Sequence, residues 1–180
     1  MRDVVDIHQD LIEKSKKGNR VAQKALFDLY SKAMYNIVVR LVGNRDDSAD
    51  ITQDGFIDAF TRLDQFEYKA TFGAWLKRIM VNRAINFLNR RRIHSDLEFD
   101  LEDYMEDDPM ENVAELMLQL NHSLAEIPEG CRVVFTLFYF EGYDHSEIAS
   151  ILKTSESTSK SQLSRAKKLL CELMNIKIEA

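Results

Sequence analysis

Apolar residues recur every three or four positions along most of this chain, a spacing that places them on one face of an α-helix. Between Asn19 and Gly43 this face comprises Ala22, Leu26, Leu29, Ala33, Ile37 and Leu41. The 180 residues include only six glycines and two prolines, which argues against a β protein rich in turns. The spacing therefore predicts an all-α protein.

Local signals divide the first half of the chain into four predicted helices. They cover about residues 6–17, 19–42, 44–63 and 72–92. Gly18 and Gly43 can adopt the left-handed conformation that ends a helix, and Asn19 can cap the second one. Ile7 is expected on the apolar face of the first helix. The segment "DQFEYKAT" breaks the helical pattern before the fourth helix.

The second half of the chain predicts a helix-turn-helix. Helical spacing resumes over 113–127, and a second helix is expected from Pro128 to Gly142. Asp144 and Glu147 then stand at the spacing of a capping box, before a short helix, the break "KTSE" and a last helix. The last helix has basic side chains and no acidic one over 157–171, which favours contact with DNA phosphates.

The charges of the chain are strongly segregated. Residues 69–92 hold seven basic side chains and no acidic one, whereas eight of the thirteen residues 96–108 are Asp or Glu. The acidic run has neither a helical nor a strand period, which is typical of a flexible linker. The chain is therefore predicted to form two small helical domains, 6–92 and 113–176, joined by the acidic linker 93–112. A simple solvated tether is one interpretation of this run.

A polar stripe is predicted on the helix over 72–92. At 100° per residue, five of its side chains fall within about 80° of one another. They are Trp75, Arg78, Asn82, Asn86 and Asn89. Amides and guanidinium groups bind base edges with two hydrogen bonds, and an aromatic ring can stack on a base. The alternative is a solvated Asn-rich face, with Trp75 as a core anchor.

Several other kinds of site are not indicated. The four histidines are scattered, Cys131 and Cys171 match no metal-ligand spacing, and no apolar run is long enough to span a membrane. We expect no metal, no cofactor and no enzymatic activity, two reduced thiols in the core, and a cytoplasmic location. A metal-dependent nuclease using the acidic run would need carboxylates on a rigid scaffold, which this run lacks.

Two long motifs resemble a known family. "SADITQDGFIDAFTRLDQF" with "FGAWLKRIMVNRAINFLNRRR" is similar to region 2 of bacterial sigma factors of the extracytoplasmic-function (ECF) group. "IPEGCRVVFTLFYFEGYDHSEIASILKTSESTSKSQLSRAKKLL" is similar to region 4 of the same group. The resemblance covers nearly the whole chain, in the family's order. It implies a factor that binds core RNA polymerase, directs it to specific promoters and promotes opening of the −10 strands.

The resemblance also implies roles for individual residues. Docking on the coiled coil of the polymerase β′ subunit would fall to Asp50, Gln53, Asp54 and Phe56. Binding of the opened −10 element would fall to Asp64, Gln65, Phe66, Lys69, Arg78, Asn82, Arg83 and Asn86. Contact with the −35 duplex would fall to Ser157, Lys160, Ser161, Gln162, Ser164, Arg165 and Lys168. Further partners implied by the family are the polymerase β flap and an anti-sigma factor of a kind that can be attached to a membrane.

The chain departs from the family's pattern in two places. After Phe66 the family usually has Arg-Gly-Asp/Glu-Ser, and this chain has "EYKAT", so an unusual −10 preference is expected. Ser159 stands where the family often has a buried Val, and the preceding turn has no Gly, so looser contact of the last helix is expected, with its docking surface retained.

Two further expectations concern function. By resemblance, the acidic run would lie in the polymerase cleft and RNA exit path and compete with RNA. Because the chain has a net charge of −6, the free protein should bind promoters poorly unless polymerase holds both domains on the DNA. The alternative is a stand-alone helix-turn-helix regulator, which would bind promoter DNA without polymerase.

Overall fold

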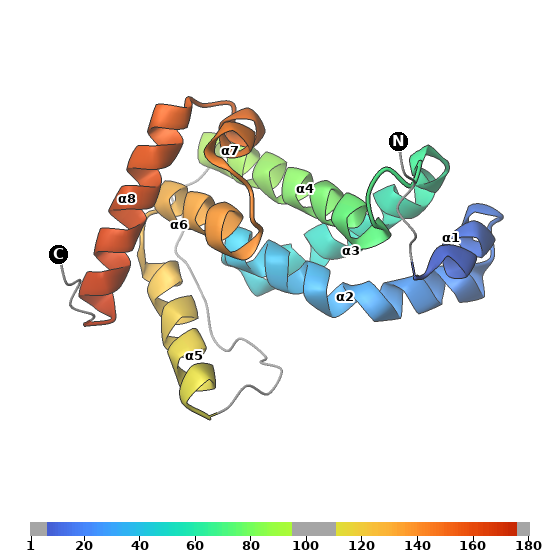
Figure 1. The fold of residues 1–180 in the computed structure, drawn as a ribbon, viewed down its shortest axis with the longest axis horizontal. Coiled ribbons are helices and arrows are strands. Elements are labelled where there is room, and N and C mark those ends of the chain that lie inside the picture. Colours follow the sequence, from blue (N-terminus) through green and yellow to red (C-terminus); the bar gives the residue numbers. More distant parts are fainter. Residues whose placement is uncertain (1–6, 95–110, 176–180) are drawn as a thin grey trace. The chain divides into compact units, whose positions relative to one another are not determined.

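The computed structural model describes residues 7–94 and 111–175, and every regular element in these two ranges is helical (Figure 1). The all-α prediction is therefore confirmed. The chain divides into two compact units, Met1–Ser95 and Asp96–Ala180. The acidic run 96–108 lies outside the described residues. The helices that flank it extend to His94 and begin at Glu111, so each takes two residues from the predicted linker 93–112.

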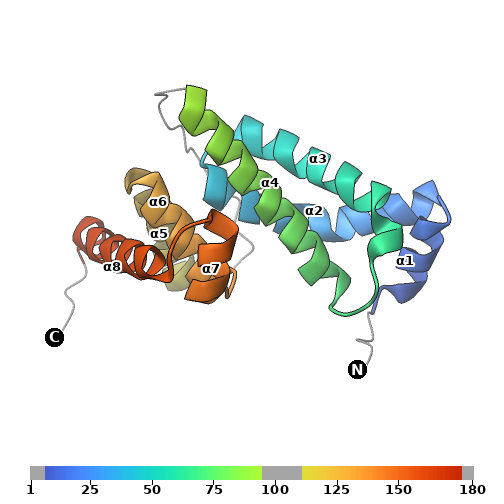
Figure 2. The same ribbon diagram turned by 90° about the horizontal axis from the view of Figure 1, so that it is seen from above.

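The described part of the first unit, residues 7–94, contains four α-helices and one 3₁₀ turn. These are α1 (Gln9–Lys16), α2 (Arg20–Val42), α3 (Arg45–Thr61), η1 (Leu63–Gln65) and α4 (Phe72–His94). Helices α2, α3 and α4 pack against one another, and α1 lies against α2 (Figure 2). A Cβ atom built on Gly55 of α3 would collide with the side chain of Met80 on α4, which is fully buried. A glycine at position 55 therefore allows these two helices to approach closely.

The helix ends follow the local signals of the sequence. Asn19 Oδ1 accepts hydrogen bonds from two backbone N–H groups of α2 at 3.0 and 3.1 Å. Gly43 ends α2 with a φ of 79° in the left-handed region. Asn44 begins α3 by accepting a hydrogen bond from the N–H of Asp47 at 2.9 Å. These caps satisfy backbone groups that have no partner within the helix.

Some apolar positions are exposed where the spacing predicted burial. Ile7 is 89 % exposed because α1 begins only at Gln9, and Leu29 of α2 is 54 % exposed. Ala33 of the same helix is also exposed. The periodicity predicted one continuous apolar face on α2. The neighbouring helices cover only part of that face, where Leu26, Ile37 and Leu41 are buried.

The regular elements over residues 111–175 of the second unit are also helical. These are α5 (Glu111–Glu126), α6 (Glu129–Phe135), the π-helical turn η2 (Thr136–Phe140), α7 (His145–Leu152) and α8 (Glu156–Leu173). The helix predicted over 128–142 is therefore present, but its second half is π-helical. There the N–H of Glu141 bonds to the carbonyl of Thr136 at 3.1 Å, which is a five-residue step rather than a four-residue step.

Helices α7 and α8 form the helix-turn-helix. Asp144 Oδ1 accepts hydrogen bonds from the N–H groups of Ser146 and Glu147, both at 2.8 Å, and Glu147 Oε2 accepts from the N–H of Asp144 at 2.9 Å. The predicted capping box is therefore confirmed. The hydrogen bond from the Glu147 N–H is the main reason why the pKa of Asp144 is lowered. In the turn, Lys153 takes the left-handed conformation, with a φ of 52°, without the help of a glycine.

Candidate nucleic-acid interfaces

The polar stripe on α4 lies on the surface of the first unit. Arg78, Asn82, Asn86 and Asn89 are all exposed, and Trp75 is half-buried. The opposite face of α4 supplies buried apolar side chains to the core, namely Phe72, Leu76, Met80, Val81, Ala84, Ile85 and Leu88. Because that face is held inward, the amides and the guanidinium group of the stripe remain available to a ligand.

An aromatic cluster joins the start of α4 to the loop before it. The Trp75 ring centroid lies 5.4 Å from that of Phe66 and 5.8 Å from that of Phe72. Phe66 is only 3 % exposed and also contacts Tyr68 at 4.7 Å. Such contacts between tilted rings stabilise the cluster beyond the area that they bury. Trp75 is therefore partly an anchor of the core, and it keeps some surface for stacking.

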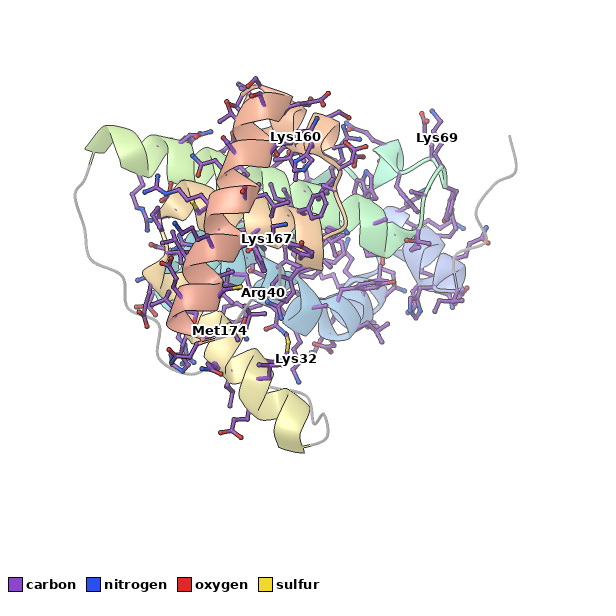
Figure 3. The ribbon with its side chains drawn as sticks, turned by 60° about the vertical axis from the view of Figure 1, so that its left-hand side comes forward. Lys32, Arg40, Lys69, Lys160, Lys167 and Met174 are labelled. Carbon is purple, nitrogen blue, oxygen red and sulfur yellow. The ribbon has the colours of Figure 1, made fainter. Side chains whose placement is uncertain are left out.

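The loop 64–71 presents polar side chains beside this cluster. Asp64, Gln65 and Lys69 are exposed, and Lys69 projects away from the loop in Figure 3. The same loop buries Phe66, which revises its predicted role as a direct contact to the −10 element. Because its ring has almost no accessible surface, Phe66 stabilises the loop by packing in the core.

The predicted docking face on α3 is partly exposed and partly core. Asp50, Gln53 and Asp54 are exposed, as direct contact with a partner requires. Phe56 is only 2 % exposed and contacts the ring of Phe27 at 4.7 Å, so we assign it to the core rather than to the docking face. Phe56 is buried and the three polar residues are exposed because α2 covers only one side of α3.

Arg83 is engaged by two carboxylates of α3. Its Nε donates to Asp58 at 2.8 Å, and its Nη1 donates to Asp54 at 2.9 Å. The hydrogen bond from Arg83 holds the pKa of Asp58 below its ordinary value. Arg83 was predicted to lie at the opened −10 strand, and here it joins α4 to α3. Asp58 was not singled out in the sequence, although its spacing of four from Asp54 places both carboxylates on one face of α3.

Six of the seven residues predicted to contact the −35 element are exposed on α8. They are Ser157, Lys160, Ser161, Ser164, Arg165 and Lys168. Gln162 is the exception, because its Oε1 accepts a hydrogen bond from Cys131 Sγ at 3.0 Å and its amide group lies 3.6 Å from a Cβ built on Gly130. Its side chain therefore faces α6 rather than the outer surface. Figure 3 labels Lys160 and Lys167 on the same helix, and Met174 directly after its end.

Ser159 is held in the helix-turn-helix by a polar contact. It is fully buried, and its Oγ lies 2.9 Å from Nδ1 of His145. The His145 ring in turn stacks on Phe138 with a centroid distance of 4.9 Å. This hydrogen bond takes the place of the apolar contact expected from the family's Val, and α8 still presents the six exposed side chains. His145 was not singled out in the sequence, because a single histidine gave no signal.

The two cysteines have different surroundings. Both are free, Cys131 is fully buried, and Cys171 is only partly buried, so the expectation of two core thiols holds for Cys131 alone. Burial raises the pKa of the Cys131 thiol, which keeps it protonated and able to donate to Gln162. Within the described residues, no group of metal-ligating side chains is found, and no helix is long and apolar enough to cross a membrane.

An apolar groove of about 500 Å³ lies in the second unit. It is bounded by α5, by α6 with η2, and by α8, and its lining residues include Leu116, Leu120, Tyr139, Leu170 and Met174. Leu116 and Tyr139 are about half exposed, at 49 % and 52 %. A surface groove with this apolar lining is a typical site for an apolar helix of a partner.

A surface of exposed amides on one helical unit and a helix-turn-helix on the other define a DNA-binding protein of two domains. The family models for sigma-70 region 2 and sigma-70 region 4 match residues 26–93 and 117–170, respectively. The chain therefore belongs to the sigma-70 family of RNA polymerase sigma factors, in its ECF group. Sigma factors are initiation factors rather than enzymes, and they bind core RNA polymerase and promoter DNA. Promoter-specific transcription initiation is accordingly the function of this chain.

Named relatives agree with this assignment. The RNA polymerase sigma-H factor of Pseudomonas aeruginosa is 28 % identical over 175 residues, which cover 90 % of this chain and 91 % of that protein. The ECF RNA polymerase sigma-E factor of Escherichia coli (strain K12) is 29 % identical, with the same coverage. The ECF RNA polymerase sigma factor SigW of Bacillus subtilis (strain 168) is 26 % identical, covering 88 % of this chain and 92 % of that protein.

Solved structures show the same fold. The sigma factor RpoE of Bartonella quintana, in complex with the anti-sigma factor NepR, aligns with a TM-score of 0.63 and 21 % identity, over 86 % of this chain and 97 % of that one. CnrH in complex with the cytosolic domain of CnrY aligns with a TM-score of 0.57 and 24 % identity, over 94 % of this chain and 98 % of that one.

Proposed function

We propose that the α4 stripe and the loop 64–71 together hold the opened −10 strand of the promoter. The observation that carries this proposal is the exposed row of Arg78, Asn82 and Asn86 on the helix that begins directly after the polar loop. Amide groups recognise base edges through two hydrogen bonds, and the half-exposed Trp75 offers a ring to an unstacked base.

The free-energy cost of extruding a base and the gain from stacking it on an aromatic ring are of similar size. Extruding one base from the stack costs a few kcal/mol. One stacking contact on an aromatic side chain returns about 1–3 kcal/mol. Because Phe66 is buried, Trp75 supplies the stacking in this proposal, and Gln65, Lys69 and Asn82 supply the polar contacts. Arg90 and Arg91, at the end of the same helix, would neutralise backbone phosphates.

Core polymerase docks on α3 in this proposal. Asp50, Gln53 and Asp54 supply polar contacts to the β′ coiled coil. Beside Gln53 lies a hollow of about 400 Å³ between α2 and α3, which is lined by Phe27 and Ile57 among others. These two side chains are 38 % and 56 % exposed, so apolar area is available for burial at the same interface.

The six exposed residues of α8 contact the −35 duplex in this proposal. Four basic side chains on α8 allow a salt slope of at most about −4, at roughly −0.9 per phosphate contact. Because the whole chain carries a charge of −6, this attraction is too weak for tight binding by the free protein. Polymerase supplies the missing affinity by holding both units at once on the promoter.

The apolar groove of the second unit is our proposed contact for the polymerase β flap. An anti-sigma factor would compete by covering the same surfaces, and such a factor could be attached to a membrane. The structural relatives are themselves bound to proteins named as an anti-sigma factor and as a cytosolic domain.

We place the chain in the cytoplasm, with its polymerase. The acidic run 96–108 is proposed to lie in the RNA exit path.

Run-off transcription tests the proposal. Purified chain and bacterial core polymerase are combined with genomic fragments, and the start sites are mapped. We expect transcripts that share −10 and −35 elements, and these should be lost when Asp50, Gln53 and Asp54 are changed to Ala. The variant Asp10→Ala, which removes an exposed ion pair on α1, is the matched control. Tight promoter binding by the chain without polymerase would instead favour the stand-alone regulator.

A further inference from the structure

Helix α1 is bonded to the loop that follows η1. Tyr68 Oη donates to Glu13 Oε1 at 2.6 Å, and Lys16 Nζ donates to the carbonyl of Phe66 at 3.1 Å. Lys16 and Glu13 also form an ion pair at 3.2 Å. The Lys16 ammonium lies 4.8 Å from the Tyr68 ring centroid, within the range of a cation–π contact. Two side chains one turn apart on α1 therefore hold a loop that is 50 to 55 residues away in the sequence.

The loop needs such support because of its backbone. Tyr68 has a φ of 57°, in the left-handed region that bulky residues rarely adopt. It occupies the position where the family's usual loop has a glycine, which can adopt this conformation without strain. The bonds from α1 and the ring contact with Phe66 at 4.7 Å keep Tyr68 in place.

The contacts are also well made. The Lys16 side chain is only 18 % exposed, so its ammonium is held by the loop rather than by water. The hydrogen bond from Tyr68 is the largest cause of the lowered pKa of Glu13, so this bond favours the ionised carboxylate. On the other side of Tyr68, the loop displays Lys69 to solvent (Figure 3).

We propose that Glu13, Lys16 and Tyr68 are positioning residues that set the conformation of the loop 64–71 and thereby its preference for a −10 base. None of the three is assigned to DNA contact itself. Because they fix the backbone on both sides of Glu67, they decide where Gln65 and Lys69 point. This inference rests on the proposed function of the loop 64–71 in holding a −10 base.

Holoenzyme binding to single-stranded oligonucleotides tests this proposal. The oligonucleotides carry a −10 element mapped by run-off transcription, with each of the four bases at each position. We expect Tyr68→Phe and Glu13→Ala each to reduce the preference for the best base about three- to tenfold, which is the range of one hydrogen bond. Glu13→Gln should retain most of the preference, because its amide oxygen still accepts from Tyr68. Combining Tyr68→Phe with Glu13→Ala should add little, since both remove the same bond.

Control variants distinguish a failure of the positioning role from a failure of the proposed function of the loop. Asp10→Ala, on the same helix but away from the loop, should leave base preference unchanged, and binding to a −35 duplex should be unchanged in all variants. Gln65→Ala with Lys69→Ala tests the loop itself. If this pair changes base preference and Tyr68→Phe and Glu13→Ala do not, the positioning role is refuted and the proposed function stands. If the pair changes nothing, the proposed function of the loop fails and the positioning role fails with it.

Discussion

The variant Arg83→Ala distinguishes two roles of this residue. The resemblance assigns Arg83 to the opened −10 strand, whereas in the structure its guanidinium group donates to Asp58 and Asp54 at 2.8 and 2.9 Å. The Arg83 and Asp58 side chains are 32 % and 29 % exposed, and Asp54 is 61 % exposed. A charge-assisted hydrogen bond contributes about 1.5–3 kcal/mol when well shielded, and an exposed pair contributes under about 1 kcal/mol. Arg83→Ala should therefore lower the free energy of unfolding by about 1 kcal/mol, mostly through the lost bond to Asp58.

Urea unfolding followed by tryptophan fluorescence measures this loss. Trp75 is the single tryptophan of the chain, so its signal reports on the first unit alone. A loss of about 1 kcal/mol should lower the urea midpoint by roughly 0.5–1 M. Asp58→Ala should have a similar effect, and the double variant should cost less than the sum of the two. Arg78→Ala, on the exposed stripe, should leave the midpoint unchanged and weaken −10 binding.

The same pair has a predictable pH dependence. The pKa of Asp58 is lowered in the folded state, so its contribution is present above its unfolded pKa of about 4 and is lost as the pH falls through the folded value. The stability difference between wild type and Arg83→Ala should therefore be full at pH 7 and should shrink below about pH 4. If Arg83→Ala abolished −10 binding with an unchanged urea midpoint at pH 7, the structural role would be refuted.

Four further substitutions test other parts of the molecule. Phe56→Ala should lower the free energy of unfolding, measured by Trp75 fluorescence, by about 3–5 kcal/mol, because it empties a core site. Gln53→Ala should weaken only polymerase binding. Equal stability of the two variants would contradict the burial of Phe56. Lys153→Gly should stabilise the second unit by up to about 1 kcal/mol in a thermal melt, since glycine adopts a φ of 52° without strain, and a lower melting temperature would contradict this. Arg165→Ala should weaken holoenzyme binding to the −35 element and make the salt dependence of that binding shallower by a slope of about one. An unchanged slope would show that Arg165 does not contact a DNA phosphate.

Local features of the sequence determined the helices and most of their ends. Gly18 and Gly43 lie in left-handed conformations, Asn19 caps α2, and the Asp144–Glu147 capping box begins α7, as the sequence predicts. A cap depends on side chains and backbone groups within a few residues, so a linear pattern contains all the necessary information. The exposure of Arg78, Asn82 and Asn86 also followed from helical geometry together with polarity.

Only the tertiary structure decided which of the remaining candidates can meet a partner. Phe56 and Phe66 lie in the core, and Gln162 turns toward Cys131, because other helices cover those sides of their elements. The pairing of Arg83 with Asp58 joins residues 25 positions apart, and that of Tyr68 with Glu13 joins residues 55 positions apart. Such contacts depend on where separate helices come to lie against each other, and no periodicity within a single helix encodes that position.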